Sequence, residues 1–295
     1  MDKDAYEHYL QAGSLSAKGL RLGLSMVKQG ASYLSVATAV EDLIAREGAQ
    51  LAFPVNLSVN DIAAHYTPTH DDALVFNAGD LVKVDVGARI GGYIGDTART
   101  LEVGTSNWRP LIEASEAGLR AALSRMRAGA NTSDIGGQVQ SAIEARGFHP
   151  IRNLTGHLLG EYQLHGRIAI PNIREAGGNI LETDQVFAVE PFATTGQGWV
   201  RDGGRSNIFN VVQKKSLNEP MLSRLMEGLE VTKGLPFSQR FAHNIQENPA
   251  KILQRLVAKG CLHAYPILKE QSGGMVSQTE DTIIVTDSEC IITTK

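Results

Sequence analysis

The chain has 295 residues, of which 42% are hydrophobic and 20% are charged, and its formal net charge is −4. These fractions are those of an ordinary globular protein and indicate neither disorder nor membrane insertion. The charge gives no bulk electrostatic support for nucleic-acid binding, so we expect no direct readout of a nucleic acid. No apolar run approaches the roughly 20 residues that a membrane-spanning helix needs.

The polar first residues, MDKDAYEHYLQ, predict that the chain has no signal peptide. Cys261 and Cys290 lack the spacing of a zinc site, and a reduced compartment suits two unpaired thiols. We therefore expect a cytoplasmic protein that acts away from membranes.

Apolar residues at helical spacing predict four helices in the first half of the chain. They are expected over 2–29, from about Ser35 to Gly48, over 108–128, and from a cap at Thr132 or Ser133 to Gly147. Between the second and the third lie an extended segment with His65 and a strand-rich stretch, residues 81–103. This first half is expected to place helices over paired strands.

The second half begins with two strand-like blocks, NLTGHLLGEYQLHG and DQVFAVEPFAT, which carry His157, His165 and Glu190. Residues 205–262 break the pattern with two helices that begin near Pro220 and Pro249. The chain then ends in strands. GDLVKVD and TDQVFAVE are weakly similar, which hints at a duplicated half. The order of elements predicts an α+β fold in which helices cover a curved antiparallel sheet.

The stretch LVKVDVGARIGGYIGDTARTLEV, residues 81–103, reads as a β-hairpin that turns at Gly91-Gly92. With an even loop, Asp85 opposes Ala98 and Asp96 opposes Gly87. Facing residues point to the same side of a sheet, so both carboxylates emerge on one face as diagonal neighbours.

Two like charges on a half-buried sheet face repel each other and are costly to bury. For one such Asp, a solvated hairpin would be the better interpretation. For the pair we favour a divalent cation between the two carboxylates.

Further polar residues interrupt apolar strands in the same way. Glu190 lies in FAVEPF, Glu280 lies in the penultimate strand, and His157 lies beside glycine in TGHLLG. For any one of them, a structural role would be the better interpretation. Together with the Asp pair they predict a metal centre, and carboxylates with an imidazole suit Mn, Co, Fe or Zn.

These motifs carry a resemblance to a known family. AAHYTP (63–68), KVDVGARIGGYIGDTA (83–98), GH…H (156–165), FAVEPF (187–192) and the Glu280 strand resemble, in order and spacing, methionine aminopeptidases of type 2. The resemblance covers essentially the whole chain. It implies one catalytic domain over 1–295 with the pita-bread fold, two pseudo-symmetric halves that close over a dinuclear metal site. Residues 205–262 resemble the helical insertion of type 2, and the absence of a long charged amino-terminal extension is similar to the short archaeal form.

The resemblance also implies roles for individual residues. Asp96 and Glu280 would bridge two ions, Asp85 would bind one of them, and His157 with Glu190 would bind the other. Glu190 would also move the proton of the attacking water, whose pKa a metal can bring to about 7. The catalytic and substrate-binding residues would include His65 and His165 at the scissile amide, and the methionine pocket would be lined by Phe53, Leu164 and Tyr265.

Three positions depart from the expected pattern. Arg201 stands where eukaryotic members carry a pocket histidine, and Thr279 and Asp281 flank Glu280 where Phe and His are expected. These departures leave open the shape of the pocket and the charge of its rim.

The function that the resemblance implies is the removal of the initiator methionine from nascent chains with a small second residue. The expected enzyme is a monomer that meets the ribosome transiently. A proline-specific peptidase shares the fold and the ligands, but those enzymes carry a sizeable domain before the catalytic one. A non-catalytic relative that binds the ribosome or RNA is a further alternative, although such proteins lose metal ligands.

Overall fold

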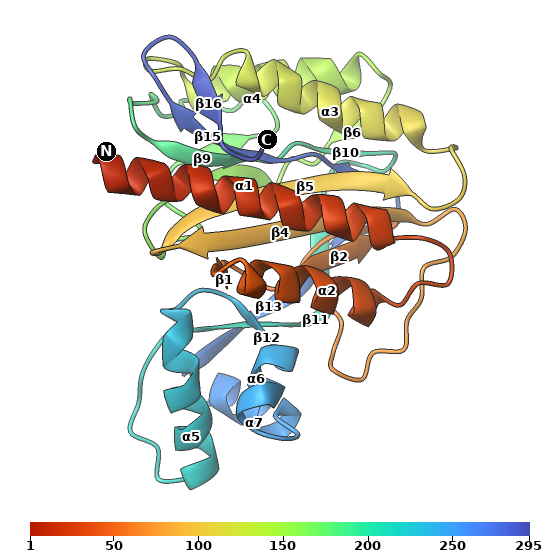
Figure 1. Cartoon of the computed structure of the whole chain (residues 1–295). Helices are drawn as coiled ribbons and strands as arrows, with labels where there is room; N and C mark the ends of the chain where they lie inside the picture. The colour runs from red at the N-terminus through yellow and green to blue at the C-terminus, as the bar shows by residue number, and fades with distance from the viewer.

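The computed structural model describes residues 1–295, and Figure 1 shows a large body with a smaller lobe attached below it. In the first half of the body, helices α1 and α2 pack against a four-stranded antiparallel sheet in which β4 is central. The bounds are α1 (Lys3–Met26), α2 (Tyr33–Arg46), β1 (Gln50–Leu51), β2 (Asn56–Val59), β4 (Leu81–Ile90) and β5 (Tyr93–Glu102).

In the second half, α3 and α4 pack against two further antiparallel sheets, with strand orders β14-β10-β6 and β16-β15-β9-β7-β8. The bounds are α3 (Arg109–Leu123), α4 (Thr132–Glu144), β6 (His149–Pro150), β7 (Thr155–Leu159), β8 (Ala169–Pro171), β9 (Val186–Val189), β10 (Phe192–Thr194), β14 (Val276–Gln278), β15 (Asp281–Val285) and β16 (Cys290–Ile292).

A fourth sheet, of order β12-β11-β13-β3, lies between the body and the lobe (Figure 1). Its strands are β3 (Ile62–Ala64), β11 (Val200–Val211), β12 (Phe237–Ser238) and β13 (Leu262–Glu270). The lobe itself is formed by α5 (Pro220–Gly228), the 3-10 turn η1 (Leu229–Thr232), α6 (Gln239–Ile245) and α7 (Ala250–Ala258). None of the helices is both long and apolar enough to span a bilayer.

Each helical layer buries its own apolar face. One core joins α1 and α2 to β4, a second joins α3 and α4 to β9 and β15, and a third lies among α5, α6 and α7. The lobe therefore has a core of its own, and the paired strands β11 and β13 connect it to the body.

The four helices predicted between residues 2 and 147 are present as α1 to α4, with ends within five residues of those expected. The cap of α4 differs: Asn131, rather than Thr132 or Ser133, accepts the hydrogen bond from the first turn, at Ser133 N. In the segment 205–262 the two predicted helices are α5 and α7, but α6 was not expected and β11 extends through the first residues of the segment. Helix α6 has only seven residues, too few to show a helical period, and β11 is held by pairing with β12 and β13 rather than by its own pattern.

Candidate metal centre and active site

The Asp hairpin has the predicted register. Asp85 lies opposite Ala98 and Gly87 lies opposite Asp96 in the ladder of β4 and β5. Gly91 and Gly92 form the turn with positive φ angles of 55° and 94°, a combination that favours glycine at both positions. Local pattern and turn chemistry therefore place both carboxylates on one face of the sheet.

The second half of the chain meets this hairpin edge to edge. An isolated antiparallel bridge joins Ala98 to Glu280, with hydrogen bonds of 3.3 Å from Ala98 N to Glu280 O and 2.9 Å from Glu280 N to Ala98 O. His157 lies on β7 opposite Ala188 of β9, and Glu190 follows directly after β9. The bridge thus brings ligands from both halves to one place.

Distances between side chains define a compact cluster. Asp96, His157 and Glu280 each offer a ligand atom, and these three atoms lie within 4.8 Å of one another. His157 Nε2 lies 3.9 Å from Asp96 Oδ2 and 3.6 Å from Glu190 Oε1. Asp85 lines the same cavity. The five residues predicted as ligands are therefore neighbours in space.

Gln278 is a member of this site that sequence reasoning missed. Its buried carboxamide Nε2 donates to Glu190 Oε2 at 3.3 Å and to Glu280 Oε2 at 3.2 Å. One amide thus orients two carboxylates and leaves their other oxygens free. A glutamine inside a short strand two residues before Glu280 was the signal available in the sequence.

The electrostatics of the cluster fit a cation. Burial, together with the charges of the neighbouring carboxylates, raises the pKa of Asp96 and of Glu280 well above the ordinary range, and burial followed by Asp85 does the same for the pKa of Glu190. Burial also raises the pKa of Asp85 to about 7. Oδ1 of Asp85 and Oδ1 of Asp96 are buried without a hydrogen-bond partner. No lysine or arginine forms an ion pair with these four groups, so a divalent ion would satisfy oxygens that nothing else in the chain satisfies.

One cavity of about 70 Å³ collects all ten residues that the sequence predicted for the site. They are Phe53, His65, Asp85, Asp96, His157, Leu164, His165, Glu190, Tyr265 and Glu280. Four further residues line it and were missed: Asn56, Ala64, Ile208 and Pro236. The apolar members suit an apolar side chain beside a polar reaction centre.

His65 reaches this cavity from the end of β3. Its Nδ1 lies 3.1 Å from the carbonyl oxygen of Pro266, so Nδ1 carries the proton and Nε2 is the free nitrogen. Its ring packs edge-on against Tyr265, with the centroids 5.4 Å apart. The backbone of His65 has φ of 66°, an uncommon conformation for a residue other than glycine. Burial lowers the pKa of His65 to about 4, so the imidazole is neutral at pH 7.

The three departures from the family pattern lie away from the cavity. Arg201 is exposed and pairs with Lys269 in the ladder of β11 and β13, whereas Ile208, on the same strand, lines the cavity. The hydroxyl of Thr279 contacts that of Ser115 at 2.8 Å. Asp281 accepts two hydrogen bonds from Arg99, at 2.9 and 3.0 Å. None of these three residues lines the cavity, so none of them directly sets the shape of the pocket or the charge of its rim.

Fold and site together define a buried candidate metal centre where the two halves of the chain meet. The model of metallopeptidase family M24 matches residues 7–287. A methionine aminopeptidase of Methanocaldococcus jannaschii is 37% identical over 296 residues, which cover 100% of each chain.

Solved structures show the same fold. A thermophilic Arx1 superposes with a TM-score of 0.87 at 18% identity, covering 99% of this chain and 91% of that one. A methionine aminopeptidase from Thermotoga maritima superposes with a TM-score of 0.73 at 23% identity, covering 100% and 98%. At these identities the superpositions establish the pita-bread fold alone. With the sequence matches, the chain belongs to metallopeptidase family M24 and is a metal-dependent peptidase.

Proposed function

We propose that this protein removes the initiator methionine from nascent polypeptides whose second residue is small. The observation that carries the proposal is the set of four carboxylates and one imidazole around a small cavity with apolar walls. The relatives named methionine aminopeptidase, at 37% identity over the full length, support the same reaction.

We propose that two divalent ions of the Co, Mn, Fe or Zn type are held by Asp85, Asp96, His157, Glu190 and Glu280. Asp96 and Glu280 would be the ligands shared by the two ions, because they come from different halves and offer ligand atoms within 4.8 Å of each other. Ions bound here would supply an activated water and would polarise the scissile carbonyl.

The protein's own groups then position the substrate and move protons. Glu190, next to His157 and held by Gln278, is placed to take a proton from the attacking water. Neutral His65 presents Nε2 to the cavity and His165 lies at its exposed rim, so both can contact the scissile amide. His65 can pass on a proton there as the carbon–nitrogen bond breaks.

Specificity is expected from the apolar wall formed by Phe53, Leu164 and Tyr265, to which Ile208 belongs as well. An unbranched thioether should fit and a charged first residue should not. One methylene in such a pocket discriminates by only about 1–3 kcal/mol, so a norleucine peptide should be cleaved tolerably well. The measurement is kcat/KM for Met-Ala-Ser, norleucine-Ala-Ser, Lys-Ala-Ser and Met-Trp-Ser. Efficient cleavage of Met-Trp-Ser, or of X-Pro with X other than Met, would instead favour another peptidase of this fold.

The alternatives have less support. A proline-specific peptidase shares the fold, but the relative matched over its full length at 37% identity is a methionine aminopeptidase. A non-catalytic relative would have lost ligands, and all five candidates are present. Metal analysis together with the Met-Ala-Ser assay separates these cases: no bound metal and no cleavage would exclude the peptidase.

We further propose that residues 1–295 act as one catalytic unit and that 205–262 is the insertion characteristic of type 2. The lobe, with its own apolar core, is the feature that supports this division. Transient contact with the ribosome is proposed because the substrate is a nascent chain.

A further inference from the structure

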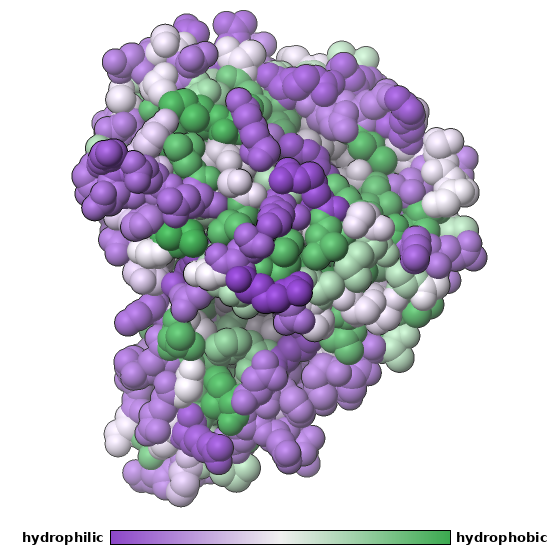
Figure 2. All heavy atoms as spheres, in the orientation of Figure 1, coloured by the Kyte–Doolittle hydropathy of each residue, from purple (hydrophilic) through white to green (hydrophobic).

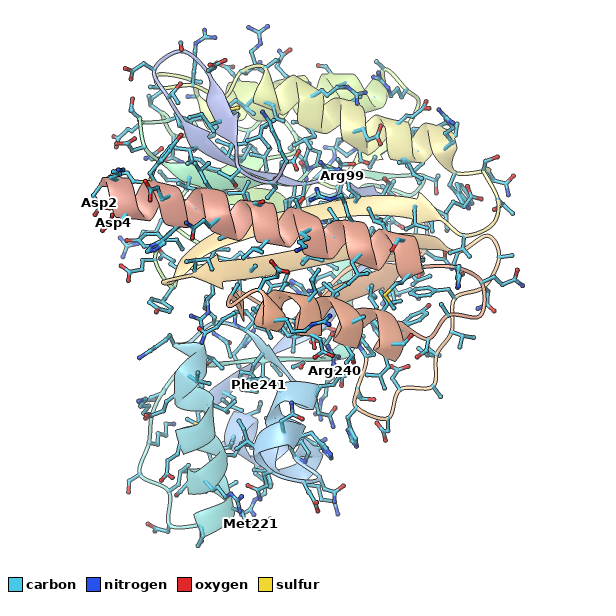
Figure 3. The ribbon with its side chains drawn as sticks, in the orientation of Figure 1. Asp2, Asp4, Arg99, Met221, Arg240 and Phe241 are labelled. Carbon is cyan, nitrogen blue, oxygen red and sulfur yellow. The ribbon has the colours of Figure 1, made fainter.

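Arg240 of α6 is a buried arginine that the proposed chemistry does not use. Its residue is 7% exposed, and Figure 3 shows it at the place where the lobe approaches α2. Figure 2 shows the molecule narrowing at this level, between the body and the lobe. A cavity of about 320 Å³, larger than the active-site cavity, is lined by Arg240 together with α2, β1 and residues 231–238. Burying a guanidinium is costly unless it is paired and hydrogen-bonded. The partners of Arg240 therefore show which parts of the chain it connects.

Its guanidinium contacts three residues in two segments, helix α2 and the stretch 65–68. Nη2 donates to Glu41 Oε1 of α2 at 2.5 Å, and Nη1 donates to Thr67 Oγ1 at 3.0 Å and to the carbonyl of Pro68. The same Glu41 oxygen accepts from Val55 N at 3.2 Å, and the Thr67 hydroxyl donates to Val55 O at 2.8 Å. Hydrogen bonds thus link Arg240, Glu41, Val55 and Thr67 in a closed ring, which includes one residue of the segment 65–68.

That segment carries His65. The backbone conformation of this segment needs support, because His65 has a positive φ. One contact is a hydrogen bond of 2.8 Å from Leu57 N to the carbonyl of the next residue, Tyr66. The other anchor of the imidazole, Pro266, lies on β13 where the chain returns from the lobe. Pro266 therefore contacts the imidazole itself, while Arg240 of the lobe contacts the two residues Thr67 and Pro68 that follow in the same segment.

We propose that Arg240 is a positioning residue, by which the lobe holds the segment 65–68 so that His65 points into the active-site cavity. This inference rests on the proposed role of His65. It assigns to the lobe a part in the reaction, although no side chain of α5, α6 or α7 lines that cavity.

Arg89 is a natural control because it also joins body and lobe. It is 6% exposed and donates to Leu51 O at 3.2 Å and to Val231 O at 3.1 Å, but it does not touch residues 65–68. If Arg240 only kept the lobe attached, replacing either arginine would have the same effect on turnover.

The test uses metal-loaded enzyme and Met-Ala-Ser. Arg240→Met is combined with Glu41→Gln, so that no buried charge is left unpaired. We expect kcat to fall by about ten- to a hundredfold, since small misplacements of a reacting group have effects of this order. KM and metal content should stay near wild type. Arg89→Met should lower the melting temperature and leave kcat unchanged.

The His65→Ala background separates positioning from general damage. When His65 is already replaced by alanine, adding the Arg240→Met/Glu41→Gln change should cause no further fall in kcat. A further fall as large as that in the wild-type background would overturn the inference. Unchanged kcat in the wild-type background, or an equal loss in Arg89→Met, would also overturn it. If His65→Ala itself keeps wild-type turnover, the proposed role of His65 fails instead, whatever Arg240 does.

Two further measurements do not depend on the double variant folding, and the second of them does not depend on turnover. Thr67→Val removes one hydroxyl acceptor of Arg240 and should lower kcat several-fold; no change would count against the inference. Diethyl pyrocarbonate should modify His65, located by mass spectrometry, faster in Thr67→Val than in wild type or Arg89→Met. Equal rates in all three proteins would show that the segment is held by other contacts.

Discussion

Two ionisable side chains of the site, His65 and Asp85, are governed by burial in opposite ways. Burial disfavours the charged form of each group, so it lowers the pKa of His65 to about 4 and raises the pKa of Asp85 to about 7. The carbonyl of Pro266 partly opposes the shift at His65, and Gln278 partly opposes that at Asp85. A cation in the cluster would satisfy Asp85, whereas His65 stays neutral and keeps Nε2 available.

Replacing His65 by alanine should reduce turnover by about 10²–10⁴-fold, the range of positioned proton transfer. Metal content should not change, because His65 is not among the five candidate ligands. A merely structural histidine would instead lose some stability and keep its activity. Turnover, metal stoichiometry and mass spectrometry on both proteins decide between these outcomes. Epoxides of the fumagillin type should label Nε2 of the wild type and leave the variant unlabelled.

Asp85→Asn should change how the stability of the metal-free protein depends on pH. The pKa of Asp85 is raised to about 7 in the folded state, against about 3.9 in an unfolded chain. The folded protein therefore binds the extra proton between these values, and its stability falls as pH rises through that window. At about 1.4 kcal/mol per pH unit, the loss is at most about 4 kcal/mol.

The asparagine variant lacks this loss. Its stability relative to wild type should increase from pH 4 to pH 8, as measured by urea unfolding after chelation. Asp42→Asn, at an exposed position of α2, is the control for the substitution itself. A difference between Asp85→Asn and wild type that is flat with pH would show that Asp85 is not strongly desolvated.

At the scale of elements, α1 packs unusually close to the body. A Cβ at Gly95 of β5 would lie 2.4 Å from Gly13 N, and a Cβ at Gly13 would lie 2.5 Å from the backbone oxygen of Thr293. Two glycines thus allow α1 to touch both β5 and the end of the chain.

Gly13→Ala should therefore destabilise the protein by about 1–3 kcal/mol, the usual range for overpacking, even though alanine is the better helix former. Gly19→Ala on the same helix is the matched control. Its Cβ would meet side-chain methyl carbons rather than backbone, those of Val40 and Val86 at 3.2 Å and of Ile44 at 3.5 Å, so less must shift than at Gly13. Equal unfolding free energies for the two variants would contradict the close contact at Gly13.

At the scale of the whole molecule, the candidate ligands join the two halves. Asp85 and Asp96 come from the first half, and His157, Glu190 and Glu280 come from the second. A metal bound to both halves must stabilise the folded state more than the unfolded one, since the unfolded chain does not assemble the site.

Metal should therefore raise the unfolding free energy, by about 2.7 kcal/mol at a hundredfold excess over Kd. Asp96→Asn should lose most of this increment and most of the activity, because a neutral amide is a poor bridge. The measurement is thermal unfolding with chelator and with each of Co, Mn, Fe and Zn, alongside turnover and metal content. Full activity of Asp96→Asn, or fewer than two ions per wild-type chain, would rule out the dinuclear site.

The sequence by itself determined the two strands of the Asp hairpin, their turn, and the carboxylates that they carry. Period-two alternation and the Gly91-Gly92 turn are local properties, so the register that places Asp85 and Asp96 on one face followed from them. The types of the ligands could also be read, because a carboxylate within an apolar strand needs a partner.

The tertiary structure decided which distant segments meet. The bridge between Ala98 and Glu280, the pairing of Asp281 with Arg99, and the approach of Arg240 to Thr67 each join residues far apart in the chain. That Ile208 rather than Arg201 lines the cavity likewise depends on where β11 runs past the site. Alternation along one strand cannot encode such contacts, because they arise from how whole sheets and helices pack against one another.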